Sequence, residues 1–402
     1  MSLDNRKREV QLEAGKAWKE SGYKGTIELN TGGGKTFIAF DAMVDLPKGS
    51  KVLFLAETNQ REMDVRKDSE VYLSFFGINP LSHVDFEFAC YQSAYKWENK
   101  CFELVIADEC HDSYSEEYVK FYRNNSYNRI LGLSATVRSK RVYLIGGMEV
   151  SKMQLMKQIA PICYSYGIAD AQKDGIGRKL NIYIINHQLD GTTKNIQGGN
   201  VKKRFMTTER KMYDYYDKLF YQGIYSKKDS LVKIAMSKRA KLLYTLPSKV
   251  EACKQLIRTI KGKTVIFNND LDSIEKITPN VVSSPRHGRS KKEQDEFNSI
   301  LRQKFDDGHI RTIGSFKILQ QGANLKRLDN VILMSYYSDN GKFCQRLGRL
   351  RVNGDKVGNV FMFVTQGTQE VTWYEKIIDD FPMEEFNVIE CNGIDECLNK
   401  LK

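Results

Sequence analysis

The stretch LNTGGGKT, Leu29 to Thr36, is the strongest indication of the fold. An apolar run typical of a buried strand, TIELN (26–30), leads into it, and a helical pattern, KTFIAFDAMV (35–44), follows it. Glycines let backbone N–H groups turn inward around a phosphate, and the N-terminus of the following helix adds partial positive charge. The stretch therefore predicts a phosphate-binding loop between a strand and a helix.

The order of residues in this loop predicts a role for each. Lys35 is expected to reach the β- and γ-phosphates, and the Thr36 hydroxyl to ligate Mg²⁺. The cradle itself is expected to consist of Thr31, Gly32, Gly33 and Gly34. The strict GxxxxGK[ST] pattern has glycine where this chain has Leu29. A purely structural glycine turn is the alternative, and the Lys-Thr pair favours nucleotide binding over it.

A pair of carboxylates gives the second signal. In ELVIADECHD (103–112) an apolar strand ends at Asp108 and Glu109. A carboxylate at the end of a neighbouring parallel strand can reach a metal held by Thr36, and the next carboxylate can polarise an attacking water. We therefore expect Asp108 to ligate Mg²⁺ and Glu109 to act as the general base. Such a pair is often only solvated, but the phosphate loop upstream favours a hydrolysis site.

Short apolar runs alternate with helix-length segments along the chain. This alternation predicts an α/β fold whose parallel sheets are covered on both faces. Two such series indicate two domains, 1–176 and 177–402, joined near the polar, glycine-containing stretch 167–179, with a short acidic tail at the end. The strands are expected at 26–30, 51–57, 86–91, 102–108 and 129–135, and then at 179–189, 263–268, 281–284, 311–315, 330–335 and 358–365.

Residues 201–245 interrupt this alternation. They carry twelve Lys and Arg against four Asp and Glu, with six tyrosines interleaved, and are expected to be helical. Basic and aromatic residues together suit phosphate contact and base stacking. The alternative is an amphipathic helical pair whose tyrosines pack on the second sheet. We favour packing for most of the tyrosines and keep the lysines as candidate contacts to a nucleic-acid backbone.

The composition narrows the class of protein. The chain has 402 residues and a net charge of +12, a balance typical of proteins that meet nucleic acid, although a basic surface can also serve solubility. The eight cysteines include no CxxC pair, which favours free thiols in a reducing compartment. The polar N-terminal stretch predicts no signal peptide, and no apolar run could span a bilayer. A cytoplasmic location without a membrane partner is therefore expected.

Four motifs occur in order: TGGGKT (31–36), DECH (108–111), LSAT (133–136) and QRLGRLR (345–351). With this set the chain resembles the superfamily 2 helicases and translocases of the DExH type over nearly its whole length. It looks closest to the branch with DNA-repair, restriction-type and phage recombination helicases. The resemblance implies two tandem RecA-like P-loop domains with parallel sheets and a cleft between them that holds ATP and Mg²⁺.

The resemblance also assigns individual residues. It implies that Gln11 reads the adenine and that Asn324 hydrogen-bonds the ribose, although QQGANL (320–325) departs from the family's acidic form. The residues expected to couple ATP to domain movement are His111, Ser134 and Thr136. Those expected to act on the transferred phosphate from the second domain are Gln345, Arg349 and Arg351. Those expected to contact nucleic acid are Thr58, Asn59, Arg61, Gln92 and Ser315.

Together these features predict an ATP-dependent nucleic-acid helicase or translocase, with DNA favoured over RNA. Three alternatives stay open: a translocase that moves on duplex DNA without unwinding it, an RNA helicase, and a nucleic-acid-binding factor that ATP only switches. The presence of Glu109 and of the arginine set argues against a factor that has lost hydrolysis.

Overall fold

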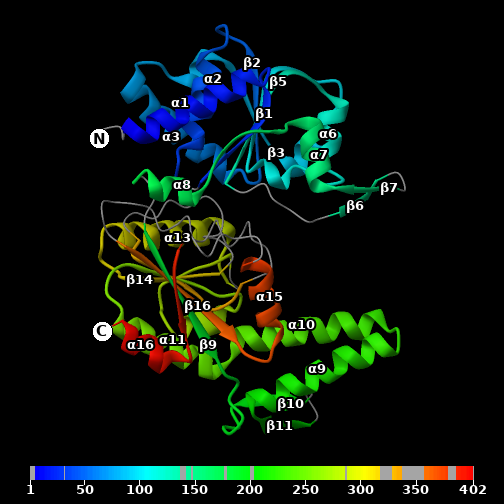
Figure 1. Cartoon of the computed structure of the whole chain (residues 1–402), viewed down its shortest axis with the longest axis vertical. Coiled ribbons are helices and arrows are strands. Elements are labelled where there is room, and N and C mark those ends of the chain that lie inside the picture. The colour runs from blue at the N-terminus through cyan, green and yellow to red at the C-terminus, as the bar shows by residue number, and fades with distance from the viewer. Residues whose placement is uncertain are drawn as a thin grey trace. The chain divides into compact units, whose positions relative to one another are not determined.

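The chain divides into two compact units, Met1–Gly177 and Arg178–Lys402, each built around its own parallel sheet (Figure 1). The computed structural model describes residues 5–30, 32–135, 142–145, 148–175, 179–199, 203–285, 288–316, 328–336, 357–378 and 386–401. Within these ranges we find no helical span that could cross a bilayer. The seven cysteines in these ranges are free thiols, and most of them are shielded from solvent.

The first unit contains a six-stranded parallel sheet with the order β3-β2-β4-β5-β1-β8. Its central strands are buried on both faces, which is why their sequences read as continuous apolar runs. The strands are β1 (Lys24–Leu29), β2 (Lys51–Ala56), β3 (Asp85–Cys90), β4 (Cys101–Asp108), β5 (Ser126–Ser134) and β8 (Ile162–Tyr166).

Helices cover both faces of this first sheet (Figure 1). On one face, α1 lies with its apolar stripe inward, and Trp18 at the end of that stripe donates a hydrogen bond to the Ile130 carbonyl at 2.8 Å. Phe102 and Phe121 are buried in the core of the other face. The helices are α1 (Asn5–Glu20), α2 (Lys35–Val44), α3 (Gln60–Phe76), α4 (Pro80–His83), α5 (Tyr91–Ala94), α6 (Val119–Asn124), α7 (Lys152–Ile159) and α8 (Ile168–Lys173), with a short 3-10 turn η1 (Cys110–Asp112).

The second unit contains a seven-stranded parallel sheet with the order β13-β14-β12-β15-β16-β9-β17. Its strands are β9 (Leu180–His187), β12 (Thr264–Phe267), β13 (Val281–Val282), β14 (Thr312–Ser315), β15 (Asn330–Leu333), β16 (Gly358–Thr365) and β17 (Asn387–Cys391). The helices of this sheet are α11 (Pro247–Thr259), α12 (Leu271–Glu275), α13 (Lys291–Asp306), α15 (Gln369–Ile378) and α16 (Ile394–Lys400). Both units therefore have the α/β architecture that the sequence predicts.

The basic segment forms a hairpin of two long helices, α9 (Glu209–Tyr225) and α10 (Asp229–Thr245), which lie side by side in green in Figure 1. Tyr213 is buried, and its hydroxyl accepts a hydrogen bond from the Gln369 backbone N–H at 2.8 Å. Tyr215, Tyr221 and Tyr225 are exposed. The expectation that most of these tyrosines pack inward is therefore wrong for three of the six, because they lie on the solvent side of the helices.

Several elements differ from the sequence expectation. Edge strands β8 and β17 were not predicted, and the expected acidic tail instead contributes β17 and α16 to the second unit. Both strands are exposed on part of their surface, so their sequences lack a continuous apolar run. Two short antiparallel hairpins also lie outside the expected pattern. They are β6 (Val142–Ile145) with β7 (Met148–Ser151), and β10 (Ile196–Gly199) with β11 (Arg204–Thr207).

Candidate active site

The carboxyl ends of the central strands of the first sheet bring the sequence motifs together. In a parallel sheet these ends share one edge, where ligands bind to the loops that leave the strands. The phosphate loop follows β1, Asp108 ends β4 and Ser134 ends β5, and these three strands are neighbours in the order β4-β5-β1. Residues that are distant in the sequence therefore meet at one place.

The phosphate loop favours glycine at two positions, at Gly34 by backbone conformation and space, and at Gly33 by space alone. Gly34 has φ +89°, and a Cβ there would collide with Nε2 of Gln11. A Cβ on Gly33 would approach Cγ of Leu29 to 2.7 Å. Helix α2 begins directly after Gly34 and has no side-chain cap, so its N-terminus faces the loop. This strand, glycine loop and helix N-terminus form the arrangement that binds a phosphate.

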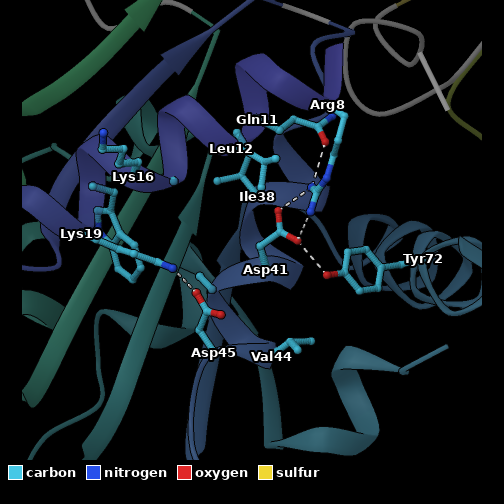
Figure 2. Close-up of a pocket in the computed structure, with 13 residues that line it drawn as sticks. Arg8, Gln11, Leu12, Lys16, Lys19, Ile38, Asp41, Val44, Asp45 and Tyr72 are labelled. Atoms are coloured by element: carbon cyan, nitrogen blue, oxygen red, sulfur yellow. Dashed lines mark hydrogen bonds and ion pairs between the residues drawn. The ribbon is translucent and has the colours of Figure 1, made fainter. Parts of the chain in front are cut away.

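Gln11 braces the loop from helix α1. Its Nε2 donates to the Gly33 carbonyl at 3.0 Å, and Arg8 Nη1 donates to its Oε1 at 3.2 Å. Figure 2 shows this side chain at the edge of a cavity of about 310 Å³ between α1 and α2. Both ends of the amide thus have partners inside the protein. The adenine contact stays a prediction. It requires the Gln11 amide to hydrogen-bond the base while it keeps or gives up one of these two bonds.

Asp41 lies in the wall of the same cavity (Figure 2). Arg8 donates to both of its carboxylate oxygens, at 2.6 and 2.8 Å, and the Tyr72 hydroxyl donates to Oδ1 at 2.7 Å. The network ties α1, α2 and α3 together behind the loop. Sequence reasoning missed it, although a single carboxylate on the apolar helix KTFIAFDAMV (35–44) is a usable signal.

Lys35 and Glu109 form an ion pair, with 3.2 Å between Nζ and Oε1. Glu109 has φ +47°, a left-handed conformation that is unfavourable for a side chain of this size and that aims it back at the loop. Its Oε2 is buried and has no hydrogen-bond partner within the described residues. An acceptor oxygen held ready in this way fits a group that takes a proton from water.

Burial raises the pKa of the Glu109 carboxyl, but the charges of Lys35 and His111 and a hydrogen bond from the Ala135 backbone lower it by more. The net pKa lies below its ordinary value, so Glu109 is ionised at neutral pH.

His111 connects Glu109 to the end of the neighbouring strand. Its Nδ1 lies 2.9 Å from the Ser134 hydroxyl and 3.5 Å from Oε2 of Glu109. Ser134 is fully buried at the end of β5. Lys35, Glu109, His111 and Ser134 therefore form one continuous series of contacts, although they come from three separate segments of the chain. The structure thus brings these four candidate residues together, and their roles stay predictions.

Thr36 and Asp108 also come together, through a residue expected elsewhere. Arg61 Nε donates to Oδ2 of Asp108 at 2.6 Å, and Arg61 Nη2 donates to the Thr36 hydroxyl at 2.8 Å. In this structure the Arg61 guanidinium lies in the phosphate site, and its expected contact to nucleic acid stays a prediction. The physical reason is that Asp108 is only 5% exposed, and a buried carboxylate needs a counter-charge.

The hydroxyl of Thr36 and the carboxylate of Asp108 are the hard oxygen ligands that Mg²⁺ takes in proteins, usually with phosphate oxygens and waters. One guanidinium spans both oxygens, so a single cation can be reached from both side chains. These two residues fit a Mg²⁺ site.

The other expected nucleic-acid contacts of the first unit lie at the ends of β2 and β3. Thr58 and Asn59 precede α3, and Gln92 is exposed on α5. Cys90 Sγ donates to Oδ1 of Asn59 at 2.9 Å, so the two loops adjoin. They form one surface at the same sheet edge as the phosphate loop.

In the second unit Ser315 ends β14, but only 1% of its surface is exposed. The expected contact of Ser315 to nucleic acid stays a prediction. A groove of about 470 Å³ lies beside it, lined by residues of α10 and of the strand ends. Its lining includes Lys241, Tyr244, Asn269 and Phe316. The side-chain amide of Asn269 is buried and has no hydrogen-bond partner within the described residues.

Six expected site residues lie outside the described residues. They are Thr31, Thr136, Asn324, Gln345, Arg349 and Arg351. Their roles stay predictions.

Two protein families match the chain. Residues 5–139 match the family of the type III restriction enzyme res subunit, and residues 248–353 match the helicase conserved C-terminal domain. No curated protein matches the chain significantly. The chain is thus similar to a restriction-enzyme subunit over most of its first unit and to the C-terminal domain of helicases over part of its second.

Solved structures show the same fold at low sequence identity. The type ISP restriction-modification enzyme LlaBIII bound to DNA is 12% identical with a TM-score of 0.60, and the match covers 98% of this chain and 31% of that chain. Dbp5 of S. cerevisiae bound to RNA and ADP BeF3 is also 12% identical with a TM-score of 0.60, covering 98% and 93%. The Pyrococcus furiosus Hef helicase domain is 14% identical with a TM-score of 0.50, covering 93% and 99%. The chain thus spans about a third of the restriction enzyme.

Proposed function

We propose that this protein is a motor that hydrolyses ATP to ADP and phosphate at the phosphate loop of its first unit and moves along nucleic acid. The observation that carries the proposal is the series of contacts from Lys35 through Glu109 and His111 to Ser134. A cation for the phosphates, a carboxylate for the water and a polar link to a strand end are the parts that coupled hydrolysis needs.

Each side chain has a defined task in this proposal. Lys35 neutralises charge on the β- and γ-phosphates, and Glu109 accepts the proton of the attacking water at Oε2, which accepts no hydrogen bond within the described residues. His111 would couple the state of Glu109 to Ser134 at the end of β5, because it contacts both side chains. Mg²⁺ held by Thr36 and Asp108 would supply further charge neutralisation at the phosphates.

We further propose that residues 1–176 and 177–402 act as two RecA-like domains and that the second completes the site. Arg349 would stabilise the charge that develops on the transferred phosphate, aided by Gln345 and Arg351, while Asn324 holds the ribose. Thr136 would extend the link from Ser134. The support is the family match of residues 248–353, which includes these positions of the second unit.

DNA is the proposed track. The match of the first unit to the restriction-enzyme family and the net charge of +12 support it. Thr58, Asn59 and Gln92 would contact the backbone from the first unit, and the lysines of α10 would do so from the second. RNA is the alternative, since one similar structure, Dbp5, is bound to RNA.

Steady-state ATP hydrolysis, measured with single-stranded DNA, duplex DNA, branched DNA and RNA, tests this proposal. We expect DNA to stimulate turnover and RNA to do so less, with Lys35→Ala inactive on every substrate. Strand separation and displacement of a third strand from duplex DNA, measured in parallel, distinguish unwinding from translocation. Turnover that no nucleic acid changes would contradict the motor. Turnover that RNA alone stimulates would contradict the choice of DNA.

A further inference from the structure

Arg61 takes up the same two oxygens that the proposed metal requires. Its Nε donates to Oδ2 of Asp108 at 2.6 Å, and its Nη2 donates to Oγ1 of Thr36 at 2.8 Å. Both contacts have the geometry of direct hydrogen bonds, and the contact to Asp108 is charge-assisted. One side chain from the start of α3 thus bridges the end of β4 and the start of α2.

A guanidinium and a metal ion cannot share this position. Mg²⁺ takes oxygen ligands at about 2.0–2.1 Å and demands near-octahedral geometry. A metal bound to both Thr36 and Asp108 would have to lie where the Arg61 nitrogens now approach them, and two cations there would repel each other. We infer that Arg61 is a displaceable gate on the metal site: it must leave Thr36 and Asp108 before a Mg²⁺–nucleotide complex can use both ligands.

The structure offers Arg61 a second partner. Its Nη1 lies 3.8 Å from Oδ2 of Asp68, further along α3, and the Asp68 side chain is partly exposed. A small rotation of the arginine side chain would replace the contact with Asp108 by a full ion pair with Asp68, without moving the helix. The gate therefore has a closed position on the metal ligands and an open position on Asp68.

The energetic consequence follows from competition. Binding of the metal with nucleotide must break the pair between Arg61 and Asp108, so the apparent affinity for Mg²⁺ is reduced by the fraction of molecules in which the gate is closed. Removal of the guanidinium should strengthen the dependence of nucleotide binding on Mg²⁺. Removal of the open-position partner, Asp68, should weaken it. The inference rests on the proposed nucleotide site and assigns Arg61 a gating role within it.

The test is the affinity of the full-length protein for a fluorescent, non-hydrolysable ATP analogue, titrated with Mg²⁺ and repeated in EDTA. In Arg61→Leu, the ratio of affinity with Mg²⁺ to affinity in EDTA should rise about tenfold, the worth of one charge-assisted hydrogen bond. In Asp68→Asn, which alters a partly exposed side chain, the Mg²⁺ concentration at half-saturation should rise. Arg66→Leu is the matched control, because Arg66 lies on the same helix and pairs with Glu62 at the surface; it should resemble the unaltered protein.

Each outcome bears on the inference. A ratio that is unchanged or lower in Arg61→Leu overturns the gate and shows that Arg61 assists nucleotide binding instead. If Arg61→Leu does not fold, Asp68→Asn decides: unchanged or tighter Mg²⁺ dependence overturns the gate. If the unaltered protein binds no analogue with Mg²⁺, the proposed nucleotide site itself fails, a result distinct from failure of the gate.

Discussion

Two lysine–glutamate pairs, one in each unit, show what separates a reactive site from a structural one. Lys35 and Glu109 lie 3.2 Å apart with side chains 11% and 29% exposed, and Glu109 keeps one buried oxygen without a hydrogen-bond partner in the described residues. Lys249 and Glu370 lie 2.8 Å apart and are 1% and 0% exposed. The same two residue types thus form one pair that is open to a ligand and one that is closed.

The closed pair satisfies its own polar groups. Lys249 Nζ also donates to two backbone carbonyls, and Glu370 Oε2 also accepts from the Thr365 backbone N–H at 2.9 Å. It joins α11 to α15 in the core of the second unit. Buried charges that are fully paired hold a structure in place, whereas a carboxylate with a free acceptor can take up a proton or a water. The comparison predicts loss of function from one pair and loss of stability from the other.

The largest effect on turnover is expected for Arg349, which is proposed to act on the transferred phosphate. Arg349→Ala should lower turnover by about a thousandfold or more, because an arginine finger acts on charge that develops in the transition state. Nucleotide affinity should change little, and nucleic acid should not rescue turnover. Turnover and affinity measured on one sample check this, and unchanged turnover would reject the assignment.

The closed pair should yield the largest loss of stability. Lys249→Met leaves Glu370 as an uncompensated buried charge, a change that costs about 3–5 kcal/mol. Urea unfolding measures the loss, and adding Glu370→Gln should restore part of it. Lys35→Met is the matched control: it removes the lysine of the open pair, where water can reach the remaining carboxylate, so stability should change far less. Equal losses would contradict the comparison.

His187, close to the closed pair, should make stability depend on pH. Burial, and then the charge of Lys249, lower its pKa to about 3. Below pH 6.5 the unfolded chain binds a proton that the folded chain does not, so stability falls as the pH falls from 6.5 toward 3. Between pH 7 and pH 5 the loss should be about 2 kcal/mol, and above pH 7 this residue should have no effect. Urea unfolding of His187→Gln should show a smaller loss over that interval than the unaltered protein; an equal loss would assign the effect elsewhere.

The smallest effect concerns the groove of the second unit. Lys238→Gln with Lys241→Gln on α10 should weaken DNA binding several-fold and reduce the slope of log affinity against log salt by up to about 2 units. Lys261→Gln is the control. Lys261 precedes β12, whereas the groove is lined by residues that follow this strand. A double variant with an unchanged salt slope would remove α10 from the DNA path.

The sequence was informative where a function depends on neighbours in the chain or on buried strands. TGGGKT (31–36) and DECH (108–111) follow strands whose apolar runs are plain, so their meeting at one sheet edge could be predicted. The partners of Asp108 and Asp41 could not, because Arg61 and Arg8 reach them across separate elements and no spacing encodes such contacts. Edge strands β8 and β17 were missed because their partial exposure removes the apolar signal.

Burial could not be predicted residue by residue. Ser315, an expected nucleic-acid contact, is only 1% exposed at the end of β14. Three tyrosines of α9 are exposed, whereas Tyr213 packs with Met212 and Leu243 in the buried cluster of the hairpin. Periodicity predicted the helices but did not determine how much of each helix the sheet would cover.

Glu109→Gln is the sharpest test of Glu109 as the general base of an ATP-hydrolysing site. The amide keeps the size of the side chain but cannot take the proton of the water. Nucleotide affinity and single-turnover hydrolysis should be measured on the same sample with saturating DNA. We predict affinity within a few-fold of the unaltered protein and hydrolysis slowed by about 100-fold to 10,000-fold. Near-normal hydrolysis by Glu109→Gln would contradict the account.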